Sequence, residues 1–438
     1  MEDAERLAAY IEKEIVTRRE QGCETWELER KLNLARNADE DVRLSRLEDV
    51  CAELDRMKPE RDFSYEEPNE IARIRNQRPQ GPRTIGAGVA PEERRTKTHG
   101  AWTGRIAGCM LGKPVEGWDR QHIRDVLEVR NAYPLDDYFP PPAEGEREEL
   151  DPNRLQLMRG QIDRGVRDDD TDYTVLGLRV LERHGKSFSS RDVAEQWLVD
   201  LPFARIYTAE RAAYRNFVNE VWPPESASRQ NPYREWIGAQ IRADIWGYVC
   251  PGQPQKAAEL AYRDASISHT RNGIYGAMWV AAMVAAGYVT SDTEQIIEIG
   301  LSEIPAGSRL TEAVETVREW YEQDSNPGQT IDRVVKQYSA YDPVHTINNA
   351  GIVAAALLWG EGDFTRSVGL AVMGGLDADC NGATVGSLTG LMTGVEGIDA
   401  HWKNPLNDTL ETAIAGDAIV SIRELANRTV QLQDAPSD

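Results

Sequence analysis

The stretch MGGLDADCNGATVGSLTG, residues 373–390, places two carboxylates between a glycine turn and a run of small residues. The paired glycines permit a tight turn, and the small residues predict a helix with a thin face that another backbone can approach closely. We therefore expect Asp377 and Asp379 in a crowded, buried place. Two buried like charges are costly unless a cation compensates them, and magnesium prefers carboxylate oxygen. The stretch favours a metal site, although an Asp-rich turn capping a helix would give the same spacing.

A second acidic cluster lies in RDDDTDYTVLGLRVLERHG, residues 167–185, where Asp168, Asp169 and Asp170 precede an amphipathic run. One or two acids at a helix start are ordinary, because the helix dipole stabilises each by roughly 0.3 to 1 kcal/mol. Three consecutive acids repel one another. Alone, the cluster is typical of a solvated helix cap. Together with the first stretch it predicts a dinuclear site with oxygen ligands at two helix starts.

A third segment, HGAWTGRIAGCMLGKPVEGW at residues 99–118, carries a regular glycine pattern. Its glycines are four residues apart and so share one helix face, at positions Gly100, Gly104, Gly108 and Gly112. Each interior glycine costs about 1 kcal/mol relative to alanine, so the pattern predicts a close helix contact. Pro114 ends the helix, and Glu116 follows it. By itself Glu116 is a surface acid after a turn; the neighbouring motifs make it a site candidate.

Four motifs in this order, LGKPVEGW, DDDTDYT, SISHTRNGIYGAMWVAA and GGLDADCNGATVG, resemble the ADP-ribosylglycohydrolase family, also called the dinitrogenase reductase activating glycohydrolase family. The resemblance covers about residues 97 to 430. It implies a single, compact, all-α bundle of many helices. It also implies a cleft in which two magnesium ions contact the ribose of an ADP-ribosyl group, with manganese as a possible substitute.

The resemblance assigns roles to individual positions. One ion would be held by Asp168, Asp169, Asp170 and Asp379, and the other by Asp377, Asp379 and Cys380. Glu116 falls on the glutamate beside the scissile glycosidic bond, and Asp170 is a second candidate for catalysis. Substrate contacts are expected from Gly238, Gln240, Arg242, His269 and Gly375. The implied activity is magnesium-dependent cleavage of the bond between ADP-ribose and an acceptor, either a protein side chain or a small molecule.

Three positions depart from the family pattern. Cys380 replaces a hydroxyl residue on the second ion, and a thiol is a poor ligand for magnesium. Asp168 also replaces a hydroxyl residue, and Gln240 replaces a small polar one. These departures leave open an N-glycosidase that acts on a smaller ribosylated metabolite or nucleoside, and a non-catalytic ADP-ribose-binding member. A cysteine hydrolase using Cys380 with His269 or His345 is disfavoured, because Asp379 would raise the thiol pKa.

The composition of the chain disfavours some classes of function. The 50 Lys and Arg residues against 73 Asp and Glu residues give a formal charge of −23, which disfavours nonspecific attraction to nucleic acid or to an anionic membrane. The five cysteines show no C-x-x-C spacing and indicate free thiols in a reducing cytoplasm. The uncharged run at residues 273–289 is short for a bilayer and favours a buried helix. We expect a cytoplasmic monomer.

The sequence pattern predicts that the chain is divided into two parts. Residues 1–95 read as an N-terminal helical extension with an extended linker, and residues 96–438 as the catalytic domain. The polar, proline-rich stretch at residues 139–153 is long enough to border the cleft as a lid. A buried ionic network is expected from Arg211, Arg234, Glu235 and Arg242. No sustained strand alternation appears, which favours an all-α fold.

Overall fold

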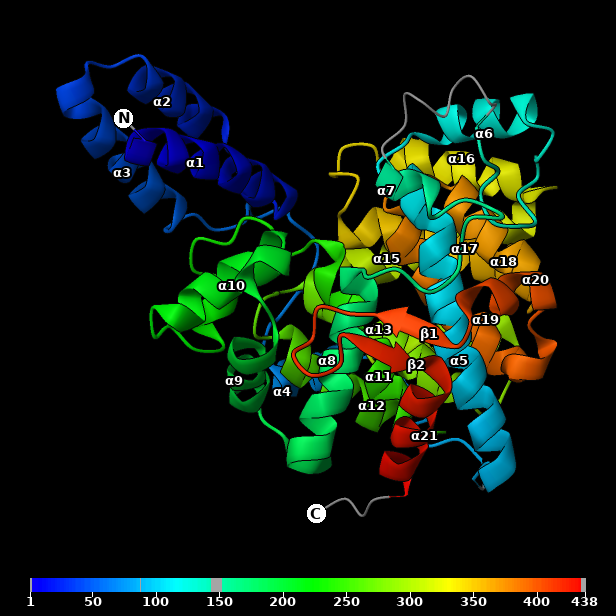
Figure 1. Ribbon diagram of the computed structural model, residues 1–438. Helices are drawn as coiled ribbons and strands as arrows, with labels where there is room; N and C mark the ends of the chain where they lie inside the picture. Colours follow the sequence, from blue (N-terminus) through cyan, green and yellow to red (C-terminus); the bar gives the residue numbers. More distant parts are fainter. Residues whose placement is uncertain (1, 87, 143–151, 435–438) are drawn as a thin grey trace.

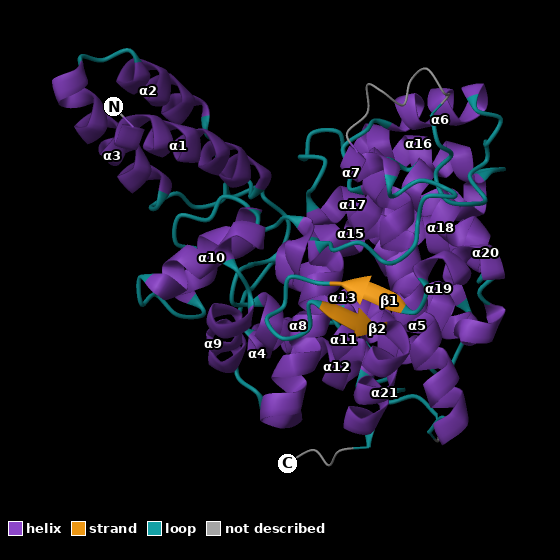
Figure 2. Ribbon diagram, viewed as in Figure 1, coloured by secondary structure: helices purple, strands orange, loops and turns teal. Residues whose placement is uncertain are grey.

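The computed structural model describes residues 2–86, 88–142 and 152–434, and helices dominate these residues (Figure 2). The helices of the first half are α1 (Glu2–Glu20), α2 (Trp26–Arg36), α3 (Glu40–Leu54), α4 (Ile71–Gln77), α5 (Pro91–Gly112), α6 (Arg120–Val129), α7 (Pro152–Leu155), α8 (Asp169–His184), α9 (Ser190–Asp200), α10 (Thr208–Val218) and α11 (Asp244–Tyr248). Those of the second half are α12 (Pro254–Ala265), α13 (Asn272–Gly287), α14 (Thr293–Leu301), α15 (Arg309–Gln323), α16 (Pro327–Gln337), α17 (Thr346–Gly360), α18 (Phe364–Met373), α19 (Ala378–Gly397), α20 (Ala400–Lys403) and α21 (Ile422–Gln433).

The all-α prediction is confirmed apart from one small hairpin. Strands β1 (Thr409–Glu411) and β2 (Ile419–Ser421) pair antiparallel, with Leu410 opposite Val420. Three-residue strands are too short to produce a readable alternation in the sequence, which is why the hairpin was not predicted.

The contact between α5 and α19 organises the main body, in which the two helices lie side by side (Figure 1). A Cβ atom on Gly104 or Gly108 would collide with the backbone carbonyl of Gly386 or Gly382, respectively. The glycines of α19 meet α5 in the same way, so both helices need the missing side chains. The predicted close helix contact is confirmed. It fixes the end of α5 against the start of α19, where the candidate site residues lie.

The hydrophobic core of the main body surrounds α13, whose residues are all buried. The uncharged run at 273–289 therefore forms a core helix, as predicted. Among the described residues, no helix combines the length and apolar character needed to cross a membrane.

Helices α1, α2 and α3 pack around a separate apolar cluster that includes Ile11, Leu32 and Leu47 (Figure 1). Buried polar bonds attach this N-terminal unit to the body. Arg234 donates two hydrogen bonds to the Glu14 carboxylate, at 2.6 and 2.9 Å.

The predicted ionic network is divided among separate groups. Glu235 pairs with Arg309 and accepts from Gln21 at 2.8 Å, next to the Arg234 pair. Arg242 lies in a different group with Glu210 and Asp264. Arg211 is exposed on α10 and stacks on Phe203, so its predicted place in a buried network was wrong.

Two connecting segments contain helices, the predicted extended linker and the segment after Trp118. The linker includes α4, and Tyr65 anchors it by donating to Glu312 at 2.9 Å. The irregular segment after Trp118 contains α6, which Asp119 caps by accepting from the backbone N–H of His122. Most of the predicted lid, residues 143–151, lies outside the described residues.

Candidate active site

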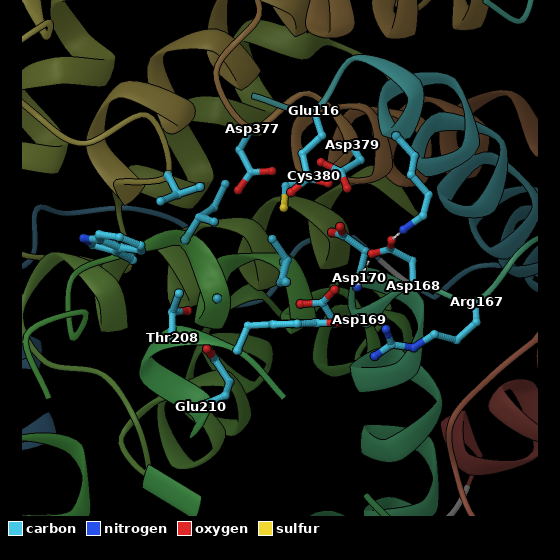
Figure 3. Close-up of a pocket in the computed structure, with 17 residues that line it drawn as sticks. Glu116, Arg167, Asp168, Asp169, Asp170, Thr208, Glu210, Asp377, Asp379 and Cys380 are labelled. Atoms are coloured by element: carbon cyan, nitrogen blue, oxygen red, sulfur yellow. Dashed lines mark hydrogen bonds and ion pairs between the residues drawn. The ribbon is translucent and has the colours of Figure 1, made fainter. Parts of the chain in front are cut away.

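A cavity of about 370 Å³ lies where the start of α8, the start of α19 and the segment after α5 converge. We call it the carboxylate cavity. Seven carboxylates and one thiol line it, and six of the carboxylates belong with the thiol to the three converging segments: Glu116, Asp168, Asp169, Asp170, Asp377, Asp379 and Cys380. Figure 3 shows these groups facing a common space, with Glu210 and Thr208 on its opposite side. The structure therefore brings together the three segments that the sequence singled out.

The start of α8 is held rigidly. Asp168 caps the helix by accepting from the backbone N–H of Asp170 at 3.0 Å, and it forms an ion pair with Lys113. The buried Arg105 donates to the Asp170 carbonyl at 2.6 Å and to the Asp244 carboxylate at 2.7 Å. These bonds fix the backbone, yet the Asp170 Oδ1 atom accepts no hydrogen bond.

The start of α19 follows a strained turn. Gly375 has φ +71°, and Leu376, which carries a side chain, has φ +59°. The backbone N–H of Asp377 donates to the side-chain oxygen of Asn349 at 3.2 Å, and Asn381 donates to the same oxygen at 2.8 Å. The turn thereby points the side chains of Asp377 and Asp379 into the cavity. The Asp379 Oδ1 atom is buried without a hydrogen-bond partner.

Three groups of side chains in this region have ligand atoms within 4.8 Å of one another. They are Cys109 with Asp168 and Asp170, Asp170 with Asp379 and Cys380, and Glu116 with Asp377 and Asp379. Asp170 belongs to the first two groups and Asp379 to the last two. Asp169 lines the cavity but joins none of these groups.

The electrostatics of the cavity suit a divalent cation. Burial raises the pKa of Asp170 and of Asp377 well above the usual range. The negative charge of Asp379 is the largest cause that raises the pKa of Glu116 to about 7. The cavity carries excess negative charge, and two of its buried carboxylate oxygens accept no hydrogen bond. Hard divalent ions prefer carboxylate oxygens as ligands. Cys380 is the exception, because burial raises the pKa of its thiol well above the usual range.

The opposite wall comes from α10 and from the 3-10 helix η6 (Ile237–Arg242). Gly238 lines the cavity, and a Cβ there would collide with the Glu210 carboxylate. Glu210 is buried, which raises its pKa to about 7. Thr208, a β-branched residue, has φ +39°, an uncommon conformation that marks the start of α10 as constrained.

Four predicted substrate residues do not line the cavity. Gln240 is fully buried behind the wall, and His269 lies behind Glu210, with Nε2 3.8 Å from its Oε1. Arg242 is buried and donates to Glu210 and Asp264 at 2.5 and 2.7 Å, so its charge is already neutralised. Gly375 packs against the backbone of Trp118 and Arg120. These four residues lie outside the lining of the cavity, and their contact with a substrate stays a prediction.

Other lining residues were missed in the sequence. Lys113 lies inside the LGKPVEGW motif and Arg167 directly precedes the three acids, so proximity to the motifs was an available signal. Glu210 and Trp236 come from segments with no local signature, and only the fold brings them to the cavity.

A solved structure described as an "ADP-ribosylglycohydrolase-related protein complex" is similar at 20% identity, with a TM-score of 0.47, over 78% of this chain and 98% of that one. No curated protein matches the chain. The sequence model of a family described as ADP-ribosylglycohydrolase matches residues 90–437. Because this match spans well over half of the chain, we conclude that the chain belongs to the ADP-ribosylglycohydrolase family and is a hydrolase of the glycosidase class.

Proposed function

We propose that the chain is a magnesium-dependent hydrolase that cleaves the glycosidic bond between the ribose of ADP-ribose and an acceptor, either a protein side chain or a small molecule. One observation carries the proposal: buried carboxylates from separate segments converge on one cavity, where Asp170 and Asp379 each present an oxygen without a hydrogen-bond partner. Leaving such groups unpaired costs about 1 to 3 kcal/mol each or more, which a bound cation would offset.

The ligands for the metal would come from Asp168, Asp169, Asp170, Asp377 and Asp379, with Cys380 as a weak neighbour. We propose two ions because Asp379 belongs to two of the three groups and so could serve both. When bound, magnesium would supply positive charge that holds the hydroxyl groups of a ribose in the cavity. Manganese, which takes similar oxygen ligands, is a plausible substitute.

Glu116 is the candidate for proton exchange at the scissile bond. Its side chain is exposed, whereas Asp168, Asp170, Asp377 and Asp379 are buried. A carboxylate that water and substrate can reach is suited to stabilise positive charge on the sugar or to activate water. Asp170, the other catalytic candidate, is buried beside Arg105, so we assign it to holding the ion and orienting the ribose.

The test is a cleavage panel with and without magnesium. It includes ADP-ribosylated arginine, serine and asparagine peptides, O-acetyl-ADP-ribose and simple nucleosides, with released sugar measured. The proposal expects metal-dependent release of ADP-ribose, at least about 100-fold slower in Glu116→Gln. The exposed Glu322→Gln change on α15 is the matched control. Release of ribose from nucleosides alone would instead identify a small-molecule N-glycosidase.

Two alternatives are tested by the same panel. A non-catalytic ADP-ribose-binding member would bind ligand and metal but release nothing. A cysteine hydrolase would require the Cys380 thiolate, yet burial and the neighbouring acids disfavour that form. Neither His269 nor His345 lines the cavity, so neither is placed to act as its base.

A further inference from the structure

A second cavity, of about 410 Å³, lies between α1 of the N-terminal unit and α10. We call it the cationic groove. Four basic side chains line it, Arg6, Lys13, Arg211 and Arg215, together with the aromatic rings of Tyr10, Phe203 and Tyr233. In a chain with a formal charge of −23, this concentration of basic groups predicts an anionic ligand.

Three of the four cations lack an acidic partner. Arg6 pairs with Asp3, but no carboxylate among the described residues pairs with Lys13, Arg211 or Arg215. Arg215 instead donates to the Gln230 carbonyl at 3.0 Å, and Arg211 stacks on Phe203 with the guanidinium carbon 4.6 Å from the ring centroid. Their positive charge is therefore available to a ligand.

The cationic groove adjoins the carboxylate cavity. Thr208 lines both of them. The Lys13 ammonium lies 5.6 Å from the ring centroid of Trp236, which lines the carboxylate cavity, and 5.4 Å from that of Tyr233. A single extended ligand could thus occupy both spaces.

Among the residues that the structure describes, the carboxylate cavity has no free cation for a diphosphate. Its two described basic side chains are already paired, Lys113 with Asp168 and Arg167 with Asp172. Arg154 is close enough to lower the pKa of Glu116, but it does not line the cavity. A cavity of about 370 Å³ is also too small for a whole dinucleotide-sized substrate.

A third cavity is an alternative site for the phosphates, because it shares Lys113 and Arg167 with the carboxylate cavity. Among its described residues, Arg205 is its one basic side chain without an acidic partner. The cationic groove offers three such side chains, so charge favours the groove for phosphates.

Helix α1, which forms one wall of the cationic groove, is held firmly against the body. Lys13 precedes Glu14, whose buried pair with Arg234 anchors α1 to the body, and Tyr233 precedes Arg234. The family match begins at residue 90, so α1 lies outside the matched part of the chain. The cationic groove therefore combines a helix outside the family-matched region, α1, with one inside it, α10.

We propose that the cationic groove binds the phosphates of the nucleotide part of the substrate, with Lys13, Arg211 and Arg215 as the anion-binding side chains. The inference rests on the proposed function for the position of the ribose. It assigns a substrate-binding role to the N-terminal extension.

The experiment measures ADP binding to the full chain by calorimetry at low salt, with adenosine as the uncharged counterpart. Lys13→Gln and Arg211→Gln should each weaken ADP binding by about tenfold, the loss of one charge-assisted hydrogen bond, and leave adenosine binding within about twofold. Arg30→Gln, an exposed arginine on α2 of the same unit, is the control and should change neither affinity. Melting temperatures verify that every variant is folded.

The inference is overturned if the wild type does not bind ADP. It is also overturned if a folded Lys13→Gln/Arg211→Gln double variant binds ADP as tightly as the wild type does. If ADP binding is unchanged while cleavage of acidic peptide substrates falls, the groove holds the acceptor instead and the proposal is wrong. Lys13-dependent ADP binding without any turnover would support the groove and count against the proposed hydrolytic function, so the two failures are distinguishable.

Discussion

The replacement Asp379→Asn should stabilise the metal-free protein and abolish its stabilisation by magnesium. In the absence of metal, the Asp379 carboxylate repels Glu116 and Asp377, whose oxygens lie within 4.8 Å. At an effective dielectric constant of about 20, two unit charges at that separation repel by roughly 3 kcal/mol. The neighbours have raised pKa values and are partly protonated, so we expect a gain of about 1 to 2 kcal/mol.

Magnesium should reverse the order of stability. At a concentration about 100 times its Kd, a bound ligand stabilises the wild type by about 2.7 kcal/mol, whereas the variant lacks the shared ligand. One kcal/mol corresponds to about 2 °C or less in a chain of this length. The variant should thus melt about 2 °C higher than the wild type after chelation and lower than the wild type in saturating magnesium.

Calorimetric melting curves with chelator and with a magnesium series provide the measurement, with Glu322→Gln as a control for loss of an exposed charge. If Asp379→Asn melts below the wild type without metal and still shows the full magnesium shift, then Asp379 is not a ligand and the electrostatic reasoning is refuted.

Three further changes test other parts of the molecule. Arg234→Met should lower the free energy of unfolding by about 3 kcal/mol in urea titrations, because it removes two charge-assisted hydrogen bonds from the buried Glu14 carboxylate and leaves it with Arg18 alone. Loss of the partly exposed Arg36 should cost under about 1 kcal/mol, and equal effects would contradict the anchoring role. Gly108→Ala should cost about 1 to 3 kcal/mol, since its methyl group would collide with the Gly382 carbonyl, and an unchanged urea midpoint would argue against the close helix contact. Cys380→Ser should retain activity and bind magnesium at least as tightly in calorimetric titration; complete loss of turnover with metal binding intact would favour a thiol nucleophile.

The parts of the fold that were predictable from sequence are those with local signals. Glycines at a spacing of four share a helix face, so Gly104 and Gly108 predicted a close helix contact. The structure identifies α19 as the partner of α5 in that contact. The two acid clusters stand at helix starts, and a helix start is also locally encoded. Their meeting in one cavity needed the whole fold or the family resemblance.

The opposite wall of the carboxylate cavity was less predictable, because the spacing of residues does not show which side chains of a short 3-10 helix face the cavity. In η6, Gly238 faces the cavity, whereas Gln240 and Arg242 point away into the body. The basic residues of the cationic groove come from α1 and α10, about 200 positions apart, and carry no motif. The sequence predicted a helical extension, but the contribution of that extension to a cavity became apparent only from three-dimensional contacts.

The arrangement of the site links a packing requirement to a chemical one. A Cβ on Gly112 would collide with the Ala378 carbonyl, so the end of α5 can approach the start of α19 only because that position is glycine. This approach brings Glu116, four residues beyond Gly112, to within 4.8 Å of Asp379. The repulsion that results is unfavourable to folding. The extensive apolar core around α13 can offset this cost, so the carboxylates can be held in place for the proposed cation before it binds.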